Sequence, residues 1–208
     1  MNLGEFHTEV GAALARGSSL EARIPGFVRR SVLWLEQNYS FKYMEKLAKV
    51  TVDADADYPR LITLPSRIKS VEFFRRLGSS GDAQLYSYLT QVDPQDVAKV
   101  EAKAPETYWL VGTDSLVLNS TPVEDFEAEV FYVGFTPWPT ANEAEPWLVV
   151  NAEQTLLDLT MLNIGVDQRD DAMQQRYGAA FKRSLDTLVT ADQAARQGNR
   201  SERMYYGG

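Results

Sequence analysis

Residues 169–197 read RDDAMQQRYGAAFKRSLDTLVTADQAARQ and carry the strongest helical signal in the chain. Apolar or small side chains recur there every three or four residues, which is the spacing of one face of an α-helix. These positions are Met173, Tyr177, Ala180, Phe181, Ser184, Leu188, Ala191 and Ala195. The stretch therefore predicts one long helix with an apolar face that must be buried against other elements.

A second helix is expected directly before this one. Residues 145–164 show the same period, and Gly165 is expected to end the helix. The short turn around Asp167 would pair the two helices antiparallel. The apolar positions of the second helix are Trp147, Val150, Leu157, Met161 and Ile164.

Two further helices are expected near the N-terminus. Residues 2–16 have helical spacing of apolar residues, and residues 24–39 begin with Pro25, which is tolerated in a first helical turn. Residues 1–45 and 145–197 together then predict a helical bundle whose longest members are the C-terminal helix pair.

The region between these helices, residues 46–144, predicts an inserted β-rich lobe. Residues 46–52 and 61–64 are expected to form a hairpin around a polar turn, and residues 67–75 a further strand. Strands at 108–111, 115–118 and 126–135 follow, the first two joined by a tight turn at Gly112, and a short helix is expected from Asp93 to Ala102. The fold class is thus α+β, a helical bundle with a small antiparallel sheet.

Residues 198–208 form an extended C-terminal arm in this interpretation. From Arg196 onward the chain carries three arginines and one glutamate, so this end opposes the acidic body in charge. Arginine and aromatic side chains dominate the energetics of protein interfaces, although chain ends are also often disordered. The candidate docking residues are Arg200, Arg203, Met204, Tyr205 and Tyr206.

Composition limits the possible chemistry. The 208 residues include no cysteine and one histidine, His7, which excludes thiolate chemistry and makes a multi-histidine site impossible. The formal charge of −8 argues against tight nucleic-acid binding, because neutralising phosphates supplies most of that affinity. No membrane-spanning segment, cofactor or metal is expected.

Two acidic segments are candidates for a site. Asp53, Asp55 and Asp57 resemble the start of a calcium loop, but the required glycine and glutamate are replaced by Tyr58 and Leu64. The other segment could bind a metal, form a solvated strand face, or repel DNA so that it slides past. Its members are Glu124, Asp125, Glu127 and Glu129.

Several motifs follow one another in an order that resembles a known family. Residues 34–41, WLEQNYSF, fit a W-L-x-x-x-x-Y-x-F run, and residues 64–71, LPSRIKSV, fit an L-P-x-x-x-K-x-V step. Residues 108–122 and the aromatic strand ending at 132–137 come next, before the closing helices. In this order the chain resembles the head-to-tail adaptor proteins of tailed bacteriophages.

The resemblance implies a non-enzymatic structural protein of the virion neck, made in the host cytoplasm. Such proteins form rings, commonly dodecamers, that join the portal protein to a tail or nozzle protein and let the genome pass through during ejection. The resemblance also implies that the C-terminal arm docks on the portal and that the middle sheet faces the tail. The ring could assemble from monomers only on the portal, and the acids at 124–129 could face its lumen or the tail.

Two alternatives remain open at this point. The first is another ring of the neck, a head-completion or tail-completion protein. The second, from a different class, is a metal-dependent hydrolase built on Asp55, Asp57, Glu127 and Glu129.

Overall fold

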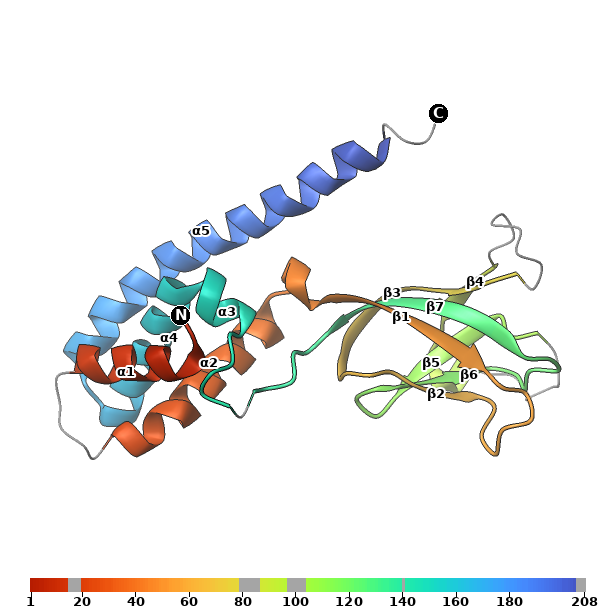
Figure 1. The fold of residues 1–208 in the computed structure, drawn as a ribbon, viewed down its shortest axis with the longest axis horizontal. Helices are drawn as coiled ribbons and strands as arrows, with labels where there is room; N and C mark the ends of the chain where they lie inside the picture. Colours follow the sequence, from red (N-terminus) through yellow and green to blue (C-terminus); the bar gives the residue numbers. More distant parts are fainter. Residues whose placement is uncertain (15–19, 79–86, 97–103, 140, 205–208) are drawn as a thin grey trace. The chain divides into compact units, whose positions relative to one another are not determined.

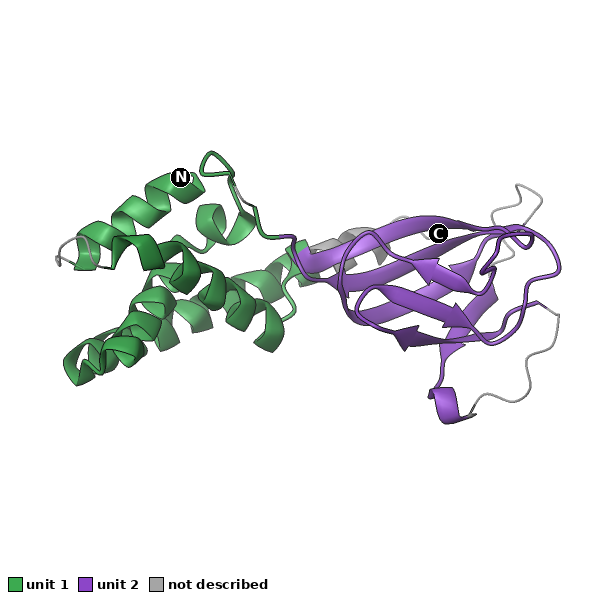
Figure 2. Cartoon of the chain, turned by 90° about the horizontal axis from the view of Figure 1, so that it is seen from below, with its two compact units in different colours: residues 1–43, 138–208 green, residues 44–137 purple. Residues whose placement is uncertain are grey.

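The computed structural model describes residues 1–14, 20–78, 87–96, 104–139 and 141–204, with side chains up to residue 197. The chain divides into two compact units, shown in different colours in Figure 2. Residues 1–43 and 138–208 form the helical unit, and residues 44–137 form the β unit. The fold class is mixed α+β.

The helical unit contains five α-helices within its described residues (Figure 1). They are α1 (Leu3–Leu14), α2 (Ile24–Asn38), α3 (Trp147–Asn151), α4 (Glu153–Gln168) and α5 (Asp171–Met204). The spacing of apolar residues explains the burial: α1 buries Leu3, Phe6, Val10 and Leu14 on one face. Pro25 lies in the first turn of α2, as predicted.

Buried polar groups connect the helices of this unit. The Ser31 hydroxyl of α2 bonds the Phe27 carbonyl and receives hydrogen bonds from Thr160 and Asn163 of α4. Asp158 of α4, 2% exposed, accepts a hydrogen bond from Ser184 of α5 at 2.9 Å. Because buried polar atoms without partners are costly, these bonds fix how α2, α4 and α5 pack.

The prediction of a single helix at residues 145–164 is wrong in two respects. The helix is interrupted at Ala152, whose φ of −135° and ψ of 30° are not helical, so that α3 and α4 are separate. It also continues past Gly165 to Gln168. Gly165 has another function: a Cβ atom there would lie 3.1 Å from Met173 Cγ, so glycine permits the close approach of α4 and α5.

Arg169 directly follows the last residue of α4, and its φ of 55° places it in the left-handed region. Because glycine adopts this conformation without steric cost, we expect Arg169→Gly to raise the free energy of unfolding by about 0.5–1 kcal/mol. Urea unfolding of both proteins measures the difference. The control Gln168→Gly lies inside the last helical turn and should lower the free energy of unfolding by a similar amount. A loss of stability for both variants would contradict the prediction.

The prediction of an extended C-terminal arm from residue 198 is wrong for residues 198–204. These residues continue α5, and residues 205–208 lie outside the described part. Glutamine, arginine and glutamate around Gly198 favour helix and outweigh the cost of one glycine, about 1 kcal/mol. Shortly before this point, Asp192 accepts a hydrogen bond from the Lys42 backbone N–H at 2.8 Å and anchors the helix.

The β unit is one seven-stranded sheet with the order β1-β7-β3-β4-β5-β6-β2. Neighbouring strands are antiparallel except β4 and β5, which are parallel. The strands are β1 (Glu45–Val52), β2 (Leu61–Thr63), β3 (Ile68–Arg76), β4 (Ser87–Gln91), β5 (Thr107–Val111), β6 (Ser115–Leu118) and β7 (Phe126–Gly134).

The hairpin expected between residues 46–52 and 61–64 is wrong. Both segments are strands, but β1 pairs with β7 over its whole length and β2 pairs with β6. β7 offers β1 an apolar partner of nine residues, whereas β2 has only three. The tight turn at Gly112 is present between β5 and β6, with φ of +65°. Of the helix expected at 93–102, residues 94–96 form a 3₁₀ turn, and 97–102 lie outside the described residues.

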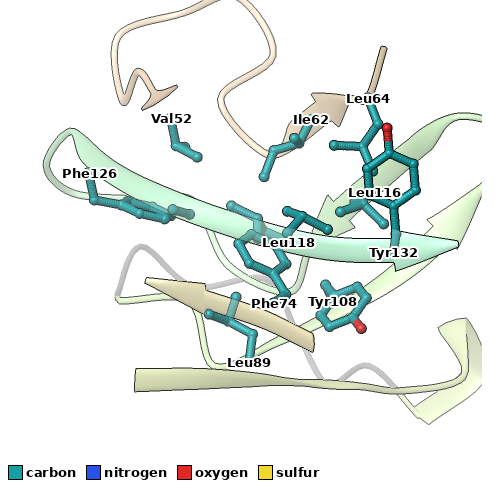
Figure 3. Packing of buried hydrophobic residues seen from close by; sticks show 12 residues of the cluster. Val52, Ile62, Leu64, Phe74, Leu89, Tyr108, Leu116, Leu118, Phe126 and Tyr132 are labelled. Carbon is teal, nitrogen blue, oxygen red and sulfur yellow. The ribbon is translucent and has the colours of Figure 1, made fainter. Parts of the chain in front are cut away.

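Alternation along the strands produces the core of the β unit. In β7 the even-numbered residues 126–132 are buried in it, and the odd-numbered residues point to the other face. Figure 3 shows the core side chains pointing toward one another from both halves of the sheet. The buried members are Val52, Ile62, Leu64, Phe74, Leu89, Tyr108, Leu116, Leu118, Phe126, Ala128, Val130 and Tyr132.

Candidate functional site

The four candidate acids of the β unit lie at β7 and the loop before it, in different environments. Glu124 accepts a hydrogen bond from Arg76 at 2.6 Å, and the carboxylate of Asp125 accepts one from the backbone N–H of Ala54. Glu127 is exposed, and no ion pair to it is found among the described residues. Only part of this acidic segment therefore carries uncompensated charge.

Glu129 is part of an ion-pair network across three strands. It lies opposite Lys49 of β1 and Arg75 of β3 in the register of the sheet, and it is 8% exposed. Its carboxylate accepts hydrogen bonds from Arg75 at 2.8 and 2.5 Å, and Lys49 Nζ lies 3.9 Å away. Glu127 and Glu129 share a sheet face as expected, but the second is neutralised and contributes to the fold.

The four acids proposed for a metal-dependent hydrolase do not come together. Within the described ranges, no three histidine, aspartate or glutamate side chains are placed to hold a metal ion. Asp55 and Asp57 are exposed in the loop after β1, whereas Glu129 is enclosed by its basic partners. This arrangement does not support the hydrolase alternative.

The side chains of His7 and Glu9 in α1 are partly buried, and burial shifts the pKa of each. His7 Nε2 and Glu9 Oε2 are buried without a hydrogen-bond partner in the described structure. Burial lowers the pKa of His7 and favours its neutral form. The pKa of Glu9 is raised, first by burial and then by the nearby carboxylate of Glu153.

We therefore expect a pH-dependent effect of Glu9→Gln. A raised pKa means that the folded protein resists ionisation of Glu9, so stability is lost as pH rises through and above the ordinary pKa of about 4.5. The variant cannot ionise and should have the higher melting temperature at pH 7, with a smaller difference at pH 4. Scanning calorimetry at both pH values measures this, and a difference that grows toward acid pH would contradict the prediction.

The candidate docking residues at the C-terminus are only partly described. The backbone places Arg200, Arg203 and Met204 on the last turns of α5. Tyr205 and Tyr206 lie outside the described residues. Their role in docking stays a prediction.

The sequence motif at residues 34–41 forms a ladder of aromatic rings in the helical unit. Ring centroids are 6.2 Å apart for Trp34 and Tyr39, and 5.9 Å for Tyr39 and Phe41. The ladder continues through Tyr43, which stacks on Trp147 of α3 at 4.5 Å. Such contacts stabilise beyond the area they bury, so the motif joins α2 to the C-terminal helices.

A pocket of about 510 Å³ adjoins this ladder and was missed by sequence reasoning. It is lined by Lys42, Tyr43, Trp147, Asn151, Leu188, Ala191, Asp192 and Ala195. The Tyr43 hydroxyl donates a hydrogen bond to Glu36, and burial together with this carboxylate raises the pKa of Tyr43. Residues far apart in the chain form the pocket, so no local pattern could have predicted it.

The described residues thus form two folded units with ion pairs, aromatic contacts and an apolar pocket. Within them, every helix is too short or too polar to cross a membrane. The family model of the SU10 adaptor protein matches residues 1–203, and the chain belongs to this family. The resemblance to phage head-to-tail adaptors is confirmed at this level. No curated protein matches the chain.

Proposed function

We propose that this protein is a head-to-tail adaptor of the virion neck, and that copies of it form a ring between the portal protein and the tail. The observation that carries the proposal is the family match over residues 1–203. Twelve copies is the number that the adaptor resemblance favours. The genome would pass through the ring during ejection without specific binding, in keeping with a net charge of −8.

Within this function, residues 198–208 are proposed to dock on the portal and the β unit to face the tail or nozzle protein. The docking side chains would be Arg200, Arg203, Met204, Tyr205 and Tyr206. Of the four acids proposed for a lumen or tail-facing surface, Asp125 and Glu127 would carry most of the negative charge, because Arg76 pairs with Glu124 and Arg75 pairs with Glu129. Repulsion of DNA by such a surface would favour its passage.

A different neck ring, a head-completion or tail-completion protein, is the alternative within the same class. The two proposals differ in the neighbour that the chain binds directly. An adaptor binds the portal protein, whereas a protein of another layer binds a ring that is already in place.

Mass photometry of the purified chain, alone, mixed with the portal protein of the same virus and mixed with its tail protein, tests the proposal. We expect monomers in isolation and complexes of ring mass only when the portal is present. Binding to a tail protein but not to the portal would favour the alternative. Association with neither would overturn both.

A further inference from the structure

The sheet of the β unit has two open edges. β1 and β2 stand at opposite ends of the strand order, and each pairs with one neighbour in the described structure. One side of each strand therefore presents backbone N–H and C=O groups to which no other described strand is paired. Groups of this kind are satisfied by water or by an added strand.

The two open edges line one groove of about 300 Å³. Residues 50–53 contribute the end of β1, and residues 61–63 contribute β2. Val52 and Ile62, one from each edge, belong to the buried core (Figure 3), and both also line the groove. The sheet thus brings its edges close without pairing them, which leaves room for a segment between them.

The groove also has apolar walls that are open to solvent. Tyr58 in the connecting loop is 76% exposed and Leu61 of β2 is 45% exposed, and both line it. Lys46 and Lys49 lie in the part of β1 before the groove, and charged residues on an edge strand discourage unspecific strand pairing. The last three residues of β1, 50–52, line the groove and include no charged residue.

Negative charge is concentrated at one end of the groove. Asp53 lines it, and Asp55 and Asp57 follow in the exposed loop, with no basic residue between Lys49 and Arg60. No ion pair to these three aspartates is found in the described part of the chain. The β unit as a whole holds 9 basic and 15 acidic residues, a formal charge of −6.

We propose that this groove binds an extended segment of a partner protein that carries lysine or arginine side chains. The segment must be extended, because a helix already uses its backbone N–H and C=O groups internally and cannot satisfy a strand edge. It must be basic to complement the three aspartates. The proposal does not depend on ring formation or on portal binding.

NMR of the full ¹⁵N-labelled chain with the synthetic peptide KVTVRVTVK tests the proposal. We expect shifts of the amide signals at residues 50–53 and 61–63, and binding that weakens as salt rises. KVPVRVPVK, in which prolines remove backbone donors, and EVTVEVTVE, which reverses the charge, should bind at least tenfold more weakly. Equal binding of all three peptides, or shifts confined to other residues, would overturn the proposal.

Two protein variants separate the groove from the rest of the surface. Ala56→Trp should fill the groove and abolish binding of KVTVRVTVK, whereas Ala141→Trp, an exposed alanine in the helical unit, should have no effect. Replacing Asp53, Asp55 and Asp57 by asparagine should weaken binding about fivefold and remove most of its salt dependence. Unchanged binding by Ala56→Trp would refute the site. Shifts at residues 50–53 that grow with protein concentration alone would identify a second copy as the occupant and overturn the proposed partner.

Discussion

Phe74→Ala should lower the free energy of unfolding of the β unit by about 3–5 kcal/mol, the usual cost of removing a fully buried phenylalanine. Phe74 is 0% exposed and lies between Val130 and Leu89 in the sheet register. Its ring centroid lies 5.3 Å from that of Tyr108, on the other half of the sheet. The substitution would leave a cavity where the two halves meet (Figure 3).

The adjacent Phe73 provides a matched control for this substitution. It points to the opposite face, is only partly buried, and stacks on Phe131 with ring centroids 5.4 Å apart. Phe73→Ala removes the same atoms and should cost about 1 kcal/mol. Urea unfolding followed by circular dichroism measures both variants. Equal losses would show that the inner and outer faces of β3 are wrongly assigned.

Periodicity predicted most of the helices and strands because it reports local geometry, but β4 (Ser87–Gln91) was missed, since its five residues are too few to show a clear alternation. The face of β7 that is buried follows from the alternation of its residues, and the long final helix follows from its apolar stripe. Alternation does not identify the partner of a strand, however, and β1 pairs with a strand about eighty residues later. The next strand in the sequence is the obvious hairpin partner for β1, but β2 pairs with β6 instead.

The roles of single residues depended on contacts that no pattern contains. A glycine at position 165 is typical of a helix end, but here it lies inside α4 and leaves space for Met173 of α5. From the sequence alone Glu129 is expected to be an exposed acid, but the register of the sheet places Arg75 beside it. The pocket beside Trp147 requires Tyr43 to reach it from far along the chain. The groove between β1 and β2 likewise exists only because the sheet brings its edges together.

Deletion of residues 198–208 should weaken portal binding at least a hundredfold and leave the melting temperature nearly unchanged. The proposed docking side chains lie in this segment, and interface energy is concentrated in few residues of such types. The contacts that anchor α5 lie before it: Asp192 bonds Lys42 and Arg196, and Arg196 also bonds the Ser40 carbonyl. The truncated chain keeps all of them.

The charge variant Arg200→Gln/Arg203→Gln separates the contribution of charge from that of length. It keeps a full-length helix and should weaken portal binding less than the deletion, with a loss that shrinks as salt rises. Mass photometry with the portal and thermal unfolding of the free chain measure both properties. A large drop in melting temperature on truncation would mean that the segment belongs to the fold. Undiminished portal binding would move the docking site elsewhere on the chain, and the apolar pocket beside Trp147 would be the first surface to test.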